Sequence, residues 1–189
     1  MLSVVIATQD SERTLLPTLA ALVAGATAGL VREVIVADAD SHDATLAIAD
    51  TAGCRVLTSR QARGARLKAA AATARASWLL FLRSGVVLEA SWVDETRHFI
   101  DDAEGRKEAG TYAVFRAGPL RRTVLEAVAL LRVALGARPT PSQGLLIARS
   151  LYDALGGHHD VEEPERELLR RLGRRRLVRL RTGAIATVT

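Results

Sequence analysis

Acidic and hydroxyl side chains gather after two short apolar segments near the start of the chain. Thr8 and Glu12 follow the apolar run 2–7, and Asp38, Asp40 and Asp43 end or follow a second run, 33–38. Grouped carboxylates repel one another unless they meet cations or hydrogen-bond donors. At the tip of a buried strand, Asp38 could accept hydrogen bonds from a nucleotide base or a ribose. Asp43 is equally well placed to cap a helix, which gives the group a structural alternative.

Basic residues that could face a phosphate occur in three places. Arg63, Arg66 and Lys68 surround Gly64, whose missing side chain would let the backbone approach an anion. Arg83 follows the apolar run 78–82. The segment 166–181 contains eight arginines and one glutamate, which fits phosphate, nucleic acid or an anionic membrane surface. Solvent-exposed helix faces would explain the same residues, and nucleic-acid binding is disfavoured because few aromatic residues flank the arginines.

Carboxylates near the end of the chain are candidates for a general base. Such a base must lie within hydrogen-bond reach of the hydroxyl that it deprotonates, and Glu163 or Glu165 is the candidate. The alternative is that both are ordinary acidic residues in the first turn of a helix. The neighbouring segment His158-His159-Asp160 could hold a metal ion, but a surface loop is the favoured interpretation.

Alternating strand and helix patterns must position these residues. Apolar runs at 2–7, 33–38, 54–58 and 78–82 predict strands, and the segments between them predict helices. Leu15, Leu19, Leu22 and Val23 form one helical stripe, which we expect to be broken by Gly25 and Gly29. This order predicts a doubly wound, parallel α/β sheet that binds ligands at the carboxyl ends of its strands.

The second half of the chain has a looser pattern. We expect helices at 92–102, 120–135, 149–155 and 163–172, a strand at 111–116 that could lie at a sheet edge, and short strands at 145–147 and 177–180. No repeat or linker divides the chain, so residues 1–189 are predicted to form a single domain. Its nucleotide-binding half would be 1–90, and its acceptor half, with the basic C-terminal segment, 91–189.

Composition narrows the class of protein and its location. The 189 residues are 49% hydrophobic and 25% charged, which is typical of a globular domain, and the net charge is +5. The single cysteine, Cys54, excludes an internal disulfide and favours a reducing, cytoplasmic setting. The uncharged stretch 14–31 is long enough to span a membrane, but Pro17 and its glycines favour an amphipathic helix followed by a loop. No signal peptide is expected, because the chain starts directly with a strand pattern.

Three segments in order resemble the family 2 glycosyltransferases of GT-A fold. Residues 3–15 are similar to that family's opening strand and helix, residues 33–45 to its second strand and base-binding aspartate, and residues 63–70 to a segment near the phosphates in small bacterial members. The resemblance implies a Rossmann-like, mostly parallel sheet flanked by helices. It further implies a nucleotide-diphosphate sugar as donor and a glycan or lipid as acceptor. The nucleotide-binding residues it implies are Thr8, Glu12, Asp38, Asp40, Arg63, Lys68 and Arg83.

Departures from the family pattern leave two hypotheses. Arg83-Ser84-Gly85 stands where the family has an Asp-x-Asp triplet that binds a divalent metal ion. By the resemblance, Mg²⁺ or Mn²⁺ would be the cofactor, but the carboxylates that usually bind it are missing here. We therefore assign no metal ligand. Ser142-Gln143-Gly144 replaces an acid-Gln-Gly acceptor segment, which leaves Gln143 and Gly144 on the acceptor side. The chain is then a glycosyltransferase in which Arg83 supplies positive charge, or a catalytically inactive binding or partner protein. In either case it would be cytoplasmic, or held at the inner face of the membrane by a peripheral contact.

Overall fold

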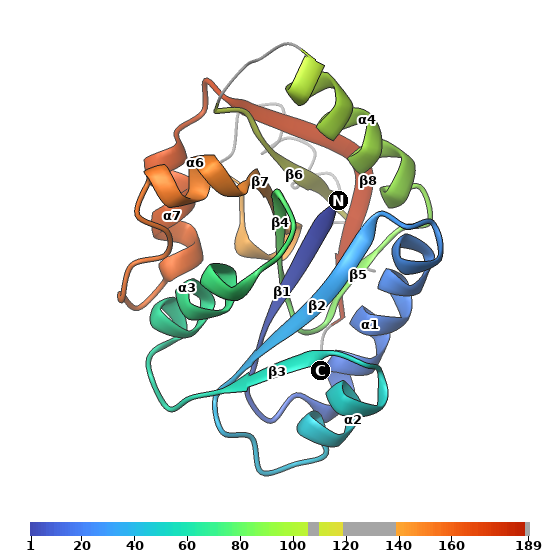
Figure 1. The fold of residues 1–189 in the computed structure, drawn as a ribbon, viewed down its shortest axis with the longest axis vertical. Coiled ribbons are helices and arrows are strands. Elements are labelled where there is room, and N and C mark those ends of the chain that lie inside the picture. The colour runs from blue at the N-terminus through green and yellow to red at the C-terminus, as the bar shows by residue number, and fades with distance from the viewer. Residues whose placement is uncertain (106–109, 119–138, 188–189) are drawn as a thin grey trace, which may run out of the picture.

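An eight-stranded sheet runs through the computed structural model, which describes residues 1–105, 110–118 and 139–187. The strand order is β3-β2-β1-β4-β7-β6-β8-β5 (Figure 1). The strands are β1 (Leu2–Thr8), β2 (Val31–Asp38), β3 (Arg55–Thr58), β4 (Trp78–Arg83), β5 (Val86–Leu88), β6 (Tyr112–Ala117), β7 (Leu145–Ala148) and β8 (Leu177–Ala186). The helices are α1 (Glu12–Thr27), α2 (Thr45–Thr51), α3 (Arg63–Thr73), α4 (Trp92–Gly105), α6 (Arg149–Ala154) and α7 (Pro164–Leu172), with a 3₁₀ turn, η1 (Pro141–Gln143).

The parallel half of the sheet brings the candidate residues to one edge. β1 pairs in parallel with β2 on one side and β4 on the other, and β3 extends the sheet beyond β2. Thr8 lies opposite Asp38, and Ala7 lies opposite Arg83. The tips of β1, β2 and β4 therefore end together, which confirms the arrangement predicted from the first 90 residues.

The other half of the sheet is mixed rather than parallel. β7 is antiparallel to β4 and β6, β8 is parallel to β6, and β5 is antiparallel to β8. The mostly parallel sheet that the family resemblance implies is therefore confirmed, and its antiparallel pairs all involve β7 or β8 within the described residues. The strand expected to lie at an edge, β6, instead lies between β7 and β8, where residues 112–115 are fully buried. Two strands differ from the prediction in other ways, because β8 continues six residues past its predicted end at 180 and β5 was not predicted. The helix expected at 120–135 lies outside the described residues.

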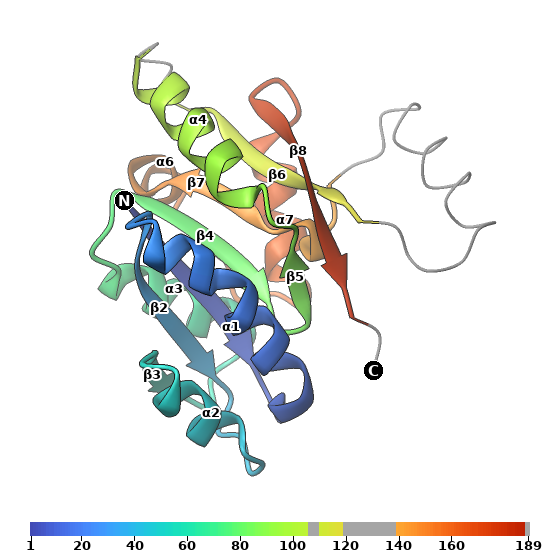
Figure 2. The ribbon, with the colours of Figure 1, turned by 90° about the vertical axis from the view of Figure 1, so that its right-hand side faces the viewer.

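Helices cover both faces of the sheet (Figure 2). One apolar layer packs the helices against each face. Successive residues of β1 point to opposite faces of the sheet. Val4 packs with α1, α2 and α4, whereas Val5 packs with α3, α6 and α7. The second layer matters for function, because it fixes the two helices that carry Arg63 and Glu165. Across the described residues, we find no helix with the length and apolar character needed to cross a membrane.

Gly25 does not end the first helix, contrary to the prediction. α1 continues to Thr27, and Gly25 is buried against the indole of Trp92. A Cβ at position 25 would lie 2.4 Å from the Trp92 Cη2 atom, and the indole Nε1–H donates to the Ala21 carbonyl at 3.0 Å. The glycine thus serves close packing of α4 on α1, and the chain turns at Gly29, whose φ is +69°.

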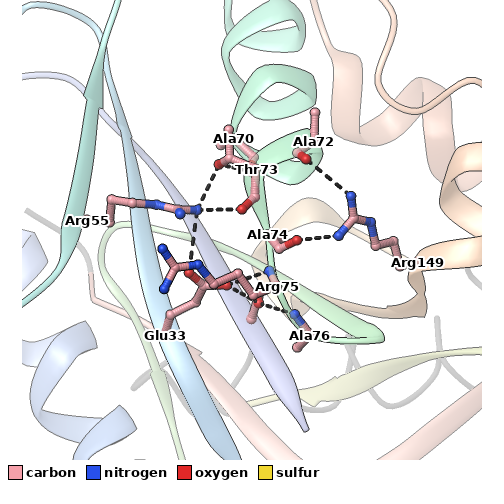
Figure 3. Close-up of polar contacts among 10 residues, drawn as sticks. Glu33, Arg55, Ala70, Ala72, Thr73, Ala74, Arg75, Ala76 and Arg149 are labelled. Atoms are coloured by element: carbon pink, nitrogen blue, oxygen red, sulfur yellow. Dashed lines mark hydrogen bonds and ion pairs between the residues drawn. The ribbon is translucent and has the colours of Figure 1, made fainter.

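Arginine side chains contact the carboxyl end of α3 (Figure 3). One of them, Arg55, is the first residue of β3, so these contacts lie at the amino end of that strand. Arg55 Nη2 donates to the Thr73 carbonyl at 2.8 Å, and Arg149 donates to the Ala74 carbonyl. Glu33 pairs with Arg55 at 3.4 Å. The last carbonyls of a helix lack intrahelical donors, so these contacts stabilise that end and fix the direction in which α3 points its first turn.

Candidate functional site

A polar cleft of about 430 Å³ lies at the carboxyl ends of β1 and β4. Its lining comes from six places in the fold: the ends of β1 and β4, the first turns of α1 and α3, the start of α7, and the residue that follows β8. Its walls are Ala7, Thr8, Gln9, Asp10, Ser11, Thr14, Arg63, Arg66, Arg83, Ser84, Glu165 and Thr187. Of the predicted site residues, the structure therefore brings together Thr8, Arg63, Arg83 and Glu165.

Asp38 supports this cleft from behind Thr8 and is not one of its lining residues. Its carboxylate is fully buried and accepts hydrogen bonds from the Ser41 backbone N–H at 2.7 Å, the Ser41 hydroxyl at 2.6 Å and the Thr8 hydroxyl at 2.6 Å. Burial raises the pKa of Asp38, but the hydrogen bonds from Ser41 and Thr8 outweigh it, so the pKa lies below its usual value. In this structure the carboxylate fixes the loop after β2 and orients Thr8.

Arg66 is a buried residue of the site that the sequence analysis counted only among several basic side chains. Its Nη1 donates to the carbonyls of Thr8 and Ala37, both at 3.0 Å. These carbonyls belong to the ends of β1 and β2, so the guanidinium joins the two strand tips to α3. The helical spacing could have indicated that Arg66 is buried, because it shares one face of α3 with small and apolar residues. The buried residues of this face are Gly64, Arg66, Leu67, Ala70 and Ala71.

Glu165 forms the centre of charge in the cleft. Arg83 Nε donates to Glu165 Oε1 at 2.9 Å, and Arg63 Nη1 lies 3.7 Å from the same oxygen. Glu165 is 9% exposed. Burial raises the pKa of Glu165, but the hydrogen bond and charge of Arg83, followed by the charge of Arg63, lower it below the usual value. The terminal nitrogens of Arg83 have no hydrogen-bond partner within the described chain and remain able to bind an anion.

Besides Asp38 and the two acceptor-side residues, four predicted site residues lie outside this cleft. Glu12 accepts the Ala44 backbone N–H at 3.2 Å in a pairing of the loops before α1 and α2. Asp40 pairs with Arg60 at 2.6 Å, and Lys68 is exposed on α3. Glu163 is exposed and pairs with Arg166 at 2.7 Å. The geometry therefore favours Glu165 over Glu163 as the carboxylate that can act in the cleft.

The two predicted acceptor-side residues shape a turn next to Glu165. The Gln143 amide is used internally, because its Oε1 accepts the Thr140 N–H and its Nε2 donates to the Phe115 carbonyl, both at 2.8 Å. Gly144 has a φ of +68°, and a Cβ there would lie 2.8 Å from Leu82 Cδ2. Gln143 therefore holds the turn, while Gly144 lines a small cavity that Glu165 also lines.

Comparison with known proteins assigns the family. Residues 3–120 match the family model described as glycosyl transferase family 2. The chain belongs to this family. Its fold is similar to TarS 1-349 from S. aureus in complex with UDP-GlcNAc, with a TM-score of 0.74 and 17% identity over 100% of this chain and 58% of that one. Glucosyl-3-phosphoglycerate synthase from Mycobacterium tuberculosis, in complex with phosphoglyceric acid, gives a TM-score of 0.67 and 20% identity over 100% and 72%.

This family 2 chain spans about 60% of the length of the TarS 1-349 structures. Another neighbour is the same M. tuberculosis synthase in complex with Mn²⁺ and UDP-glucose, with a TM-score of 0.64 and 18% identity over 100% of this chain and 72% of that one. A search of curated proteins found no match. At these identities the structural neighbours establish the GT-A fold.

The residues of this family 2 cleft do not fit a divalent metal ion. Arg83 occupies the first position of the triplet, Gly85 the third, and the Ser84 hydroxyl is 2.6 Å from the Thr14 hydroxyl. Mg²⁺ and Mn²⁺ prefer carboxylate and other oxygen ligands, but the two carboxylates that line this cleft, Asp10 and Glu165, already accept hydrogen bonds from the His42 N–H and from Arg83. Three arginines line the cleft beside them. Over the described ranges, no cluster of three His, Cys, Asp or Glu side chains is arranged to hold a metal.

The histidine pair is split between interior and surface. His158, expected in a surface loop, is only 1% exposed. The centre of its ring lies 4.7 Å from the centre of the Phe81 ring, and its Nδ1 lies 2.9 Å from the Tyr152 hydroxyl oxygen. His159 remains exposed, with its Nδ1 3.6 Å from Glu167. The surface-loop interpretation is therefore wrong for His158.

Proposed function

We propose that the chain transfers a sugar from a nucleotide-diphosphate sugar to an acceptor hydroxyl, with the cleft as its donor site. The observation that carries the proposal is the contact of Glu165 with Arg83, which puts a deprotonated carboxylate and an anion-binding guanidinium in one cleft. Family membership and neighbours that hold UDP-GlcNAc and UDP-glucose support it.

The residues have distinct roles in this proposal. Arg83 and Arg63 bind the diphosphate, since guanidinium groups pair with phosphate oxygens in a bidentate manner. Thr8, oriented by Asp38, lies at the nucleotide end of the cleft. Arg66 holds the strand tips in place. The positive charge of Arg83 and Arg63 serves where the family uses a metal, and it stabilises the negative charge that develops on the departing diphosphate.

Glu165 acts as the general base. The acceptor oxygen forms a bond to the anomeric carbon while the bond from that carbon to the diphosphate oxygen breaks. The hydroxyl proton passes to Glu165, and the nucleoside diphosphate departs with the bonding electron pair. Because the pKa of Glu165 is lowered, the carboxylate is ionised at neutral pH, as a base requires.

The acceptor would approach from an arginine-lined groove next to Glu165. This groove, of about 710 Å³, is lined by Arg166, Arg170 and Arg174, and it shares Leu169 with the small cavity at Glu165. Arg170 and Arg174, together with Arg166, whose guanidinium also pairs with Glu163, favour an acceptor, glycan or lipid, that carries a phosphate or carboxylate group. The same surface would give a peripheral contact with anionic headgroups at the inner face of a membrane.

A second candidate function is a non-catalytic nucleotide-sugar-binding protein. The observation that favours it is the same ion pair. Arg83 donates a hydrogen bond to Glu165 Oε1 and lowers the pKa of this carboxylate, which makes it a weaker base. In this case the cleft would bind a nucleoside diphosphate without turnover.

Titration calorimetry and a donor-hydrolysis assay, each with and without Mn²⁺, separate these functions. Glu165→Gln should retain UDP or UDP-sugar binding and lose turnover, whereas Arg83→Met should weaken binding at least tenfold. The control is Arg97→Met, which removes an exposed guanidinium from α4. Binding without turnover in the unaltered chain supports the second function. Absence of binding to any nucleoside diphosphate at millimolar concentration overturns both.

A further inference from the structure

His158 and Glu165 each bury an unpartnered polar atom beside the same small cavity. The His158 Nε2 and the Glu165 Oε2 have no hydrogen-bond partner in the described parts of the chain, and both are inaccessible to solvent. Both residues line a cavity of about 20 Å³ between α7 and the ends of β4 and η1. A buried polar group without a partner costs about 1–3 kcal/mol, so two such groups beside one cavity call for an explanation.

The hydrogen bonds around Tyr152 define which nitrogen of His158 carries the proton. The Tyr152 oxygen accepts the His158 backbone N–H at 3.1 Å, and it lies 2.9 Å from the ring Nδ1. Within the described chain, this nitrogen is the acceptor available to the Tyr152 O–H. In the tautomer that gives the Tyr152 hydroxyl an acceptor, this hydroxyl donates to Nδ1 and the ring proton lies on Nε2. Burial lowers the pKa of His158 to about 4, so the ring is neutral at physiological pH.

The two residues that carry this donor and this acceptor thus line one cavity of the right size for a single water. About 10–15 Å³ accommodates one water molecule, provided that it meets two to four polar partners. His158 Nε2–H can donate to it, Glu165 Oε2 can accept from it, and Arg83, which lines the same cavity, supplies further N–H donors.

We infer that a water molecule links His158 Nε2–H to Glu165 Oε2, and that His158 is a positioning residue for this carboxylate. The inference rests on the proposed function in so far as Glu165 is its base. Arg83 fixes one oxygen of the carboxylate, and His158 fixes the other through water, so the plane of the carboxylate is set on both sides. Neither residue type nor spacing suggested this role, because the sequence offered only two adjacent histidines.

Charged groups from every neighbouring element enter this arrangement. Arg83 from β4 and Arg63 from α3 face Glu165. Glu165, Glu167 and Arg171 from α7 act on His158, together with His159 from its own loop. Because a donated hydrogen bond favours the ionised carboxyl, loss of His158 raises the pKa of Glu165 while the two arginines keep it below that of an unpaired buried glutamate.

The test uses two substitutions and a matched control. His158→Phe keeps the aromatic packing against Phe81 and removes the donor, whereas His158→Gln retains an amide N–H in a similar place. His159→Gln changes the exposed neighbour and is the control. Thermal unfolding of each variant shows whether the fold is retained. If His158→Phe unfolds, the position of the ring proton in the unaltered chain, measured by nitrogen-15 NMR, decides.

Three measurements are expected to agree. Nitrogen-15 NMR of the unaltered chain should show the proton of the His158 ring on Nε2. Carbon-13 NMR of the Glu165 carboxyl should show its pKa rising by about half a unit to one unit in His158→Phe, with a return toward the original value in His158→Gln and no change in His159→Gln. The acidic limb of the pH profile for turnover should move by the same amount.

A proton on Nδ1, or a Glu165 pKa that His158→Phe leaves unchanged, would overturn the inference. The two NMR measurements need no turnover, so their outcome is independent of the proposed function. If they behave as expected but Glu165→Gln transfers sugar at the original rate, the general-base assignment fails and the water-mediated contact stands.

Discussion

The ion pair between Arg83 and Glu165 can be measured by a double-mutant cycle. Arg83→Met removes the guanidinium and keeps much of the aliphatic stem, and Glu165→Gln removes the charge while keeping an oxygen that can accept the Arg83 N–H. The two side chains are in direct contact at 2.9 Å, so their substitutions should not be additive.

The magnitude follows from how each partner is buried. Breaking a buried ion pair by removing one partner costs about 3–5 kcal/mol, because an uncompensated charge remains inside the protein. Here the Arg83 side chain is 39% exposed, and Arg63 stays 3.7 Å from the carboxylate. We therefore expect Arg83→Met to lower the free energy of unfolding by about 1.5–3 kcal/mol, Glu165→Gln by about 1 kcal/mol, and a coupling energy of about 1–2 kcal/mol.

Urea denaturation at pH 7 and at lower pH provides the assay. The pKa of Glu165 is lowered in the folded state, so its pairing stabilises the fold above the unfolded pKa of about 4.3 and is lost as the pH falls through the lower folded value. The penalty of Arg83→Met should accordingly shrink as the pH falls below about 4.3. A coupling energy under about 0.5 kcal/mol at pH 7 would refute the reasoning, because it would show that the carboxylate does not depend on Arg83.

Three further substitutions test the supports of the cleft. Asp38→Asn should lower the free energy of unfolding by about 2–4 kcal/mol at pH 7. Because the pKa of Asp38 is lowered in the folded state, its carboxylate stabilises the fold above the pKa of the unfolded chain, and this stabilisation is lost in acid. The variant should therefore lose less stability than the unaltered chain below about pH 4, which urea denaturation across pH checks. Gly25→Ala should cost about 1–3 kcal/mol by forcing a Cβ against Trp92, with partial recovery in the double variant with Trp92→Phe, measured by thermal unfolding. Arg149→Met should cost about 1–2 kcal/mol at the end of α3 and leave nucleotide affinity unchanged in calorimetry; weaker binding would place that end of the helix in the site.

The parallel half of the fold was predictable because its strands are short apolar runs separated by helices of regular pattern. The runs at 2–7 and 78–82 carry enough apolar residues to be recognised alone, and their order restricts the topology. β5 has three residues, which is too short for any periodicity to show. The direction of β7 and β8 depends on pairing across long separations, and composition does not record it.

Helical phase in the sequence could have favoured Glu165 over Glu163 as the carboxylate that we propose as the base. Glu165 precedes Leu168, Leu169 and Leu172 by three, four and seven positions, which places it on the buried face of α7, whereas Glu163 precedes the helix. The buried state of His158 had no such signal, because it depends on Tyr152 and Phe81, which reach it through the tertiary fold.

The substitution of Arg83 at the family's metal-binding position is balanced by the residues around it. Arg63, Arg66 and Arg83 line the cleft and give it three positive charges, against the two carboxylates of Asp10 and Glu165. Asp10 already accepts the His42 backbone N–H at 2.8 Å, and Arg66 is held by two carbonyls. Arg83 and Arg63 are therefore the cations left to share between Glu165 and an incoming anion. Because a diphosphate carries more charge than one carboxylate, its binding would draw both guanidinium groups away from Glu165 and make that carboxylate a stronger base when the donor is in place.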